Sequence, residues 1–120
     1  MSAFADALDR VAARVPEAEA VMIIGTDGIP IEKMVLRPDP SLEAVAAELT
    51  TLLRASLSAA NDTGLGPMKE LSLVTEKTTT LLVSITPEYY LFASLAKGAV
   101  VGRARFALRM AGLTLLPEFE

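Results

Sequence analysis

The sequence predicts an α/β fold in which an antiparallel β-sheet is covered by helices on both faces. Three observations predict it. The expected elements follow the order helix, two strands, helix, three strands, helix. Connections between neighbouring strands are short, which favours antiparallel pairing. Residues 89–95 are mostly apolar at both odd and even positions, as in a central strand with both faces covered. We therefore expect a three-layer sandwich that forms one domain over residues 1–120.

The first predicted helix spans residues 2–15. Its apolar residues recur at a spacing of three or four, and Ser2 is a suitable N-cap. Pro16 disfavours helical geometry at the residue before it, so we expect the helix to end there.

A β-hairpin is predicted next, with strands at residues 20–24 and 29–35. The segment Gly25-Thr26-Asp27-Gly28 separates them, and its Asp-Gly pair should supply the positive φ angles of a tight turn. A phosphate-binding loop would need four residues between its glycines and a following Gly-Lys-Ser/Thr at the start of a helix. We therefore interpret this segment as a turn.

A long middle helix is predicted from Ser41, its N-cap, to about Asn61, ahead of the breaker segment 64–67. The face expected to dock on the sheet is mainly apolar and comprises Leu42, Val45, Ala46, Leu49, Leu52, Leu53 and Ser56. The opposite face is small and nearly uncharged, and comprises Ala44, Ala47, Thr51, Ala55 and Ser58, with Glu48 and Arg54 at its edges. Small side chains let another helix approach closely, so we expect contact with a second copy or a partner protein. The alternative is that alanine only favours the helix.

Three further strands are predicted at residues 68–75, 78–86 and 89–95. If the strand at 68–75 lies at the border of the sheet, its unpaired backbone groups could pair with a second copy. The candidate contact residues on this strand are Met68, Glu70, Ser72 and Val74. The alternative is that the charged side chains of Lys69 and Glu70 protect the edge.

The last predicted helix covers residues 99–115. Its basic residues are Arg103, Arg105 and Arg109. Arginine in such a place can bind an anion or assist phosphoryl transfer. We favour the simpler interpretation, in which the arginines solvate a core-facing helix and Phe106 and Met110 pack on the first helix.

Composition excludes several classes of function. The chain has no cysteine and no histidine, so neither a Ser-His-Asp nor a Cys-His catalytic arrangement can form, and the usual zinc ligands are missing. Carboxylate chemistry and oxygen-only magnesium or calcium sites are not excluded, since the chain has 15 acidic residues. We nevertheless expect no enzymatic activity, no cofactor and no metal site. A net charge of −4 argues against nucleic acid as a partner. No apolar run approaches the roughly 18 residues of a membrane span, and the N-terminus does not resemble a signal peptide. We therefore expect a soluble cytoplasmic protein.

Several segments, in their order and spacing, resemble the roadblock family, which includes the dynein light chains of that name and bacterial and archaeal regulators of small GTPases. The resemblance runs from Leu8 to about Met110. The segments that carry it are residues 15–21, 27–31, 75–83, 89–91 and 98–105. None of them is specific alone, but their order over nearly the whole chain is.

The resemblance implies a five-stranded sheet with the middle helix on one face and the two terminal helices on the other. It also implies a homodimer in which the middle helices pair and the third strands join. Members of this family act as platforms for Ras-like GTPases, and the bacterial gliding-motility type is similar in length and composition. In that type, a dimer stimulates one GTPase by reorganising the catalytic loop of the GTPase, without an arginine finger.

We therefore expect a non-enzymatic homodimer that binds and regulates a small Ras-like GTPase through the middle helix. One alternative is a structural adaptor, like a motor light chain, that leaves nucleotide turnover unchanged. Another is a small-molecule sensor, which predicts a cavity lined by Tyr89, Tyr90 or Phe92.

Overall fold

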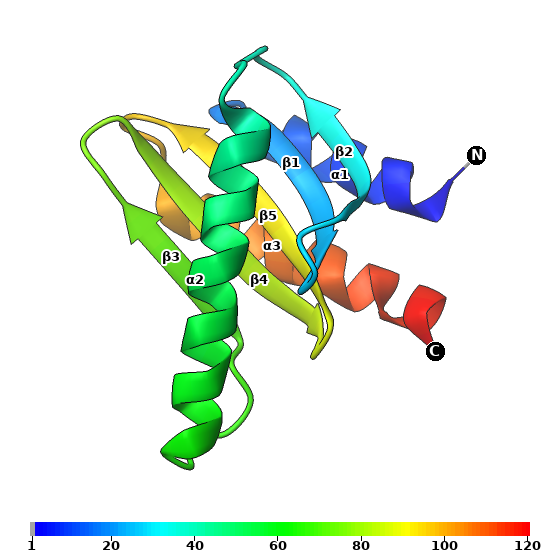
Figure 1. The fold of residues 1–120 in the computed structure, drawn as a ribbon. Helices are drawn as coiled ribbons and strands as arrows, with labels where there is room; N and C mark the ends of the chain where they lie inside the picture. Colours follow the sequence, from blue (N-terminus) through cyan, green and yellow to red (C-terminus); the bar gives the residue numbers. More distant parts are fainter. Residues whose placement is uncertain (1) are drawn as a thin grey trace.

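The computed structural model describes residues 2–120, in which a five-stranded antiparallel sheet lies between helices (Figure 1). The elements along the chain are α1 (Ala3–Arg14), β1 (Ala18–Gly25), β2 (Pro30–Val35), α2 (Leu42–Asp62), β3 (Glu70–Val74), β4 (Thr78–Thr86), β5 (Tyr89–Ala96), α3 (Val101–Leu115) and the short 3-10 helix η1 (Leu116–Phe119). The strand order is β2-β1-β5-β4-β3. The predicted element order and the central position of β5 are confirmed, and β3 lies at the border of the sheet.

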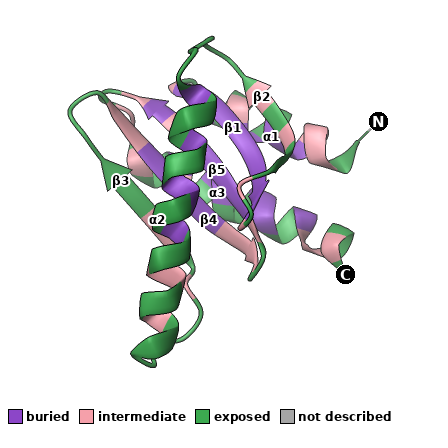
Figure 2. Cartoon of the chain, viewed as in Figure 1, coloured by how far each residue is buried: buried purple, intermediate pink, exposed green. Residues whose placement is uncertain are grey.

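Helices cover both faces of the sheet, with α2 on one face and α1 and α3 on the other (Figure 1). Side chains alternate between the faces along a strand. Leu91 and Phe92 of β5 therefore enter opposite cores, Leu91 beneath α1 and α3 and Phe92 beneath α2. Figure 2 shows that burial is concentrated in β1 and β5 at the centre of the molecule. This is the predicted three-layer sandwich.

Local signals explain the start of α1 and the first turn. Ser2 Oγ accepts hydrogen bonds from the backbone N–H groups of Phe4 (3.2 Å) and Ala5 (3.3 Å), which confirms the predicted cap. In the β1–β2 turn only Gly28 has a positive φ, at 86°. Asp27 contributes differently from the prediction, because its Oδ1 accepts a hydrogen bond from the N–H of Ile29 at 2.9 Å. This side-chain bond closes the turn without a positive φ at Asp27.

Ser41 occupies the predicted N-cap position of α2, but its side chain makes no capping hydrogen bond. Its hydroxyl donates to Asp39 Oδ1 (2.7 Å), and its backbone N–H donates to the same oxygen (2.9 Å). Both bonds stabilise the ionised carboxylate and hold the pKa of Asp39 below its ordinary value. The bond from the backbone N–H has the larger effect. Ser41 is already helical in conformation, so the carboxylate of Asp39 organises the entry to α2.

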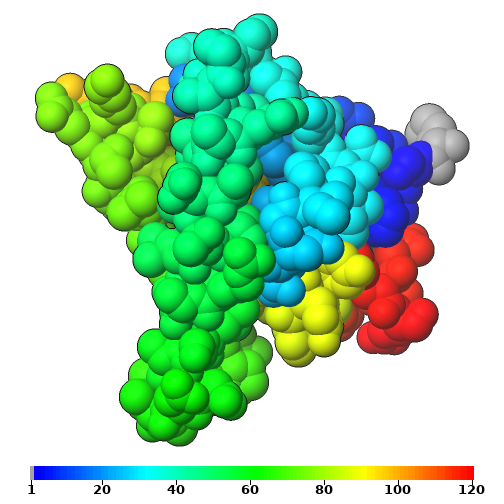
Figure 3. All heavy atoms as spheres, viewed as in Figure 1, coloured from blue at the N-terminus to red at the C-terminus, as the bar shows by residue number. Residues whose placement is uncertain are grey.

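The core-facing side of α2 is narrower than predicted. Its buried residues are Leu42, Ala46, Leu49, Thr50 and Leu53, all in the first part of the helix. Thr50 is buried without an unpaired hydroxyl, because its Oγ1 donates to the carbonyl oxygen of Ala46 at 2.8 Å. The last turns of α2 extend past the end of the sheet, as both the ribbon and the space-filling view show (Figures 1 and 3). Val45 and Leu52, predicted for the core, are 36% and 40% exposed, and Ser56 is half-buried.

The packing of α3 also differs from the prediction. Phe106 and Met110 do not bury themselves against α1, since they are 58% and 42% exposed. The residues of α3 that are buried in this core include the small Ala104, Ala107 and Ala111. Small side chains at such positions let two helices approach closely.

Candidate functional site

The outer face of α2 points away from the sheet and consists mainly of small side chains (Figure 3). The residues predicted for contact on this face are all exposed: Ala44, Ala47, Glu48, Thr51, Arg54, Ala55 and Ser58. We call this set the α2 face. A second helix or a loop could approach its backbone closely beside the alanines, although Glu48 lies in the same row as Ala44 and Ala55.

One flank of α2 is tied to the first hairpin. Arg54 Nη1 donates to the carbonyl oxygen of Thr26 at 2.9 Å, and Lys33 Nζ donates to Glu43 Oε1 at 3.3 Å. The Arg54 guanidinium is thus engaged within the chain, although its side chain stays exposed. These bonds orient α2 on the sheet and leave its other flank facing β3.

The flank towards β3 carries the two apolar side chains that the sequence placed in the core. Val45 lies on the side of α2 opposite Arg54, which bonds to the first hairpin, so this flank faces the β3 side of the sheet. Leu52 lies two turns further along the same flank. Val45 and Leu52, with the exposed Leu73 of β3, form an apolar border that we call the β3-side flank. Sequence periodicity missed it, because a partly covered flank has the same spacing as a core face.

The edge strand β3 has two distinct faces. Leu71 packs into the core beneath α2, so Glu70, Ser72 and Val74 point to the opposite face. Ser72 and Val74 are exposed as predicted. Met68 precedes the strand and packs against the core beneath α2, so it contributes little to an exposed edge.

Glu70, predicted as a contact residue, is bound within the chain. Its carboxylate accepts hydrogen bonds from Arg105 Nε at 2.7 and 2.8 Å and from Arg109 Nη2 at 3.3 Å. The side chain of Glu70 is largely buried by these partners. Two of the arginines interpreted as solvating groups therefore hold α3 against β3. No local pattern could have revealed pairs separated by 35 and 39 residues.

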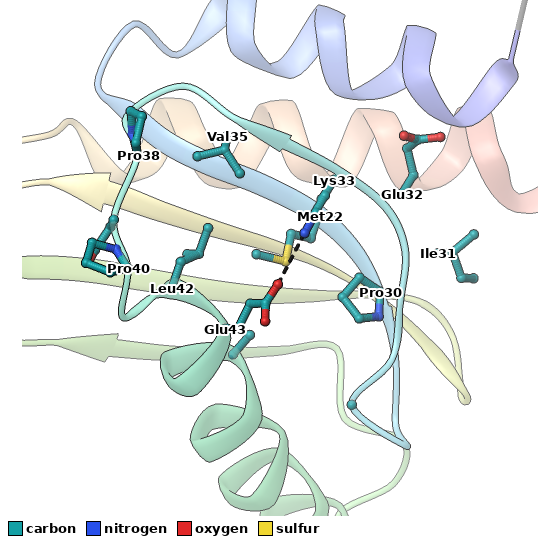
Figure 4. Close-up of a pocket in the computed structure, with 13 residues that line it drawn as sticks. Met22, Pro30, Ile31, Glu32, Lys33, Val35, Pro38, Pro40, Leu42 and Glu43 are labelled. Carbon is teal, nitrogen blue, oxygen red and sulfur yellow. Dashed lines mark hydrogen bonds and ion pairs between the residues drawn. The ribbon is translucent and has the colours of Figure 1, made fainter.

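An open groove of about 950 Å³ lies between β2 and the first turns of α2 (Figure 4). Met22 forms part of its lining, and the Lys33–Glu43 ion pair spans it. Its other lining residues include Pro30, Ile31, Val35, Pro38, Pro40 and Leu42. Sequence reasoning did not anticipate this groove. It forms because α2 covers the central strands and leaves the edge strand β2 partly open.

The groove is not the cavity that a sensor was expected to have. Tyr90 and Phe92 are fully buried in the packed core, and Tyr89 packs against Phe119 with ring centroids 4.7 Å apart. Burial raises the pKa of the Tyr90 phenol, and the nearby hydroxyl of Ser84 opposes this only in part. Tyr90 and Phe92 are therefore part of the packed core, and none of the three aromatic residues lines the groove beside β2.

Within residues 2–120, no three acidic side chains come together in a cluster able to hold a metal ion. In the same part of the chain, no helix combines the length and apolarity needed to cross a membrane. The prominent features are surfaces: the α2 face, the β3-side flank and the groove beside β2.

Comparison with known families identifies the fold. Residues 4–95 match the model of the Roadblock/LC7 domain. The chain belongs to the Roadblock/LC7 family. This confirms the resemblance inferred from the sequence, and the structure shows the arrangement that the resemblance implied, with α2 on one face and the terminal helices on the other. No curated protein matches the chain.

Solved structures of this family are similar over nearly the whole chain. The Roadblock/LC7 domain from Streptomyces avermitilis shares 17% identity and covers 94% of each chain with a TM-score of 0.82. MglC from Myxococcus xanthus shares 26% identity, covering 98% of this chain and 99% of its own, with a TM-score of 0.72. The gliding protein MglB from Thermus thermophilus shares 15% identity, covering 96% and 87%, with a TM-score of 0.83. The likeness to the Streptomyces and Thermus structures, at 17% and 15% identity, establishes the fold alone. The function is argued from the site.

Proposed function

We propose that the protein forms a homodimer through α2 and β3, and that this dimer binds and regulates a small Ras-like GTPase without chemistry of its own. The observation that carries the proposal is the α2 face, a long exposed helical surface of small residues beside an edge strand with free backbone groups. Family membership supports it, because the sequence resemblance implied both a dimer and a GTPase partner. One solved structure of similar fold is described as MglB with a tetrameric arrangement, so self-assembly occurs in a protein of this fold.

The geometry divides the surface between the two contacts. Antiparallel pairing of β3 with its copy would satisfy the free backbone groups of both edges. The same pairing would bring the two β3-side flanks together, so that Val45 and Leu52 become covered. The outer residues of the α2 face would then form a shared platform for the GTPase, bordered by the groove beside β2.

Arginine substitutions test the platform. Ala47→Arg and Ala55→Arg each place a long charged side chain on the α2 face, whereas Ala13→Arg places one at an exposed helical position on the other side of the sheet. The purified variants are compared by sedimentation velocity and by binding to the purified Ras-like GTPases of the host organism, loaded with GDP or a non-hydrolysable GTP analogue. We expect the α2 variants to lose dimerisation, GTPase binding or both, and Ala13→Arg to retain both.

Two outcomes would count against parts of the proposal. If both α2 variants keep dimerisation and GTPase binding intact, the surface is assigned wrongly. If a GTPase binds but its rate of GTP hydrolysis and nucleotide exchange is the same with and without the protein, the protein is a structural adaptor and no regulator.

A further inference from the structure

A stripe of large apolar side chains runs along the outer surface of α3. Phe106 is 58% exposed, Met110 42% and Leu113 66%. Their spacing of four and three residues aligns them on one side of the helix. Exposed apolar side chains aligned in this way, on a helix whose other side is already packed, are typical of a docking surface. The surface lies on the opposite side of the sheet from the α2 face.

The stripe continues into a shallow cavity of about 250 Å³ between α1 and α3. The two helices run in opposite directions, as the Phe4–Phe119 ring contact at 5.5 Å shows. The cavity is lined by Arg10, Val11 and Arg14 of α1 and by Ala107, Met110, Ala111 and Thr114 of α3. A groove between two antiparallel helices can receive a third helix along its length.

The rim of this groove is basic in an acidic protein. The three charged residues of α3 are all arginines, and the edge of α1 that lines the cavity adds Arg10 and Arg14. Arg105 and Arg109 pair with Glu70, but within residues 2–120 neither Arg10, Arg14 nor Arg103 forms an ion pair. The whole chain carries a net charge of −4, so this concentration of unpaired arginines is a local feature. Charge complementarity therefore favours an acidic partner.

We infer that the α1–α3 groove binds an amphipathic acidic helix of a partner protein, with apolar side chains on Phe106, Met110 and Leu113 and acidic side chains on Arg10 and Arg14. A second copy of this chain fits poorly, because the arginines of the two copies would repel. An anionic membrane also fits less well, since the chain as a whole is negatively charged and Met110, one of the three stripe residues, lines a groove between helices. The inference is independent of the GTPase proposal, because the two surfaces lie on opposite faces of the sheet.

A synthetic peptide tests the inference directly. The probe is a fluorescein-labelled amphipathic helix of about 18 residues, long enough to span α3, with leucines at spacings of three and four and glutamates on both flanks. Its control carries lysine in place of each glutamate. We expect the glutamate peptide to bind the full-length protein saturably in fluorescence anisotropy, with affinity that falls as salt is raised. The lysine peptide should not bind.

Variants locate the site. Phe106→Ser and the double variant Arg10→Glu/Arg14→Glu should each weaken binding of the glutamate peptide at least tenfold, whereas Leu65→Ser, at an exposed loop position, should leave it unchanged. Circular dichroism melts confirm that each variant folds. Absence of saturable binding, equal binding of the lysine peptide, or equal affinity of the variants overturns the inference. It is also overturned if phosphatidylserine vesicles bind in place of the peptide, or if Phe106→Ser changes the oligomeric state of the protein itself.

Discussion

Leu52→Ser should weaken self-association of the protein while leaving its fold intact. Leu52 lies on the β3-side flank of α2, where pairing of two β3 strands would cover it with the copy in the other protomer. It is already 60% shielded in one chain, since 40% of the side chain remains exposed. Serine removes the apolar surface and keeps a side chain that the helix tolerates.

The expected size follows from that exposed fraction. Complete burial of a leucine side chain contributes about 1.5–3 kcal/mol. Covering the remaining 40% of Leu52 should therefore contribute about 0.6–1.2 kcal/mol in each protomer. A two-fold symmetric dimer contains the contact twice, so the dimer should lose roughly 1.2–2.4 kcal/mol. The dissociation constant of the dimer should then rise about 8- to 60-fold.

Sedimentation equilibrium over a range of concentrations measures this constant directly. Leu36→Ser is the matched control, because Leu36 is 43% exposed and follows β2, at the border of the sheet farthest from β3. The control should leave the dissociation constant unchanged. Equal constants for Leu52→Ser and the unsubstituted protein, or equal weakening by both substitutions, would refute the placement of the dimer interface.

Three further predictions concern stability, measured by urea unfolding. Glu70→Gln should lower the free energy of unfolding by about 1–3 kcal/mol, because Arg105 loses a charged acceptor. If Glu70→Gln lowers the free energy of unfolding by the same amount in an Arg105→Gln background, the contact with Arg105 is not the cause. Leu53→Ala should lower the free energy of unfolding by about 2–5 kcal/mol, since the Leu53 side chain of α2 is fully buried against the sheet. No change in the free energy of unfolding would mean that α2 does not pack as described. Tyr90→Phe should not destabilise the protein, because within residues 2–120 the buried hydroxyl has no well-formed hydrogen bond. Burial raises the pKa of Tyr90 above its ordinary 10.0, so the folded state holds the phenolic proton more tightly and stability should fall as the pH rises above that value; Tyr90→Phe should remove this part of the pH dependence.

Most of the secondary structure and part of the candidate site could be predicted from local signals. The Ser2 cap, the break before Pro16 and the turn at Gly28 act within a few residues, so the sequence shows them directly. The continuous apolar character of residues 89–95 likewise predicted a central strand, since only a strand covered on both faces needs it. The small residues of the α2 face were identified in the same way, because the period of a helix separates its two sides.

The remaining features of the site depend on how the elements stack. Helical spacing could not show that Val45 and Leu52 stay partly uncovered, because this depends on where α2 lies across the sheet. The Glu70 carboxylate could equally have faced a partner, until folding brought Arg105 to it from 35 residues away.

The sequence alone determined a chain without histidine or cysteine, in which three helices and five strands alternate in the order of the Roadblock/LC7 fold. It could do so because composition and the period of apolar residues do not depend on how the elements pack together. The tertiary structure decided which surfaces remain open: the β3-side flank, the groove beside β2 and the apolar stripe on α3. In the last case, α3 buries small alanines in the core it shares with α1 and leaves Phe106 exposed, an outcome of packing between helices that are distant in sequence.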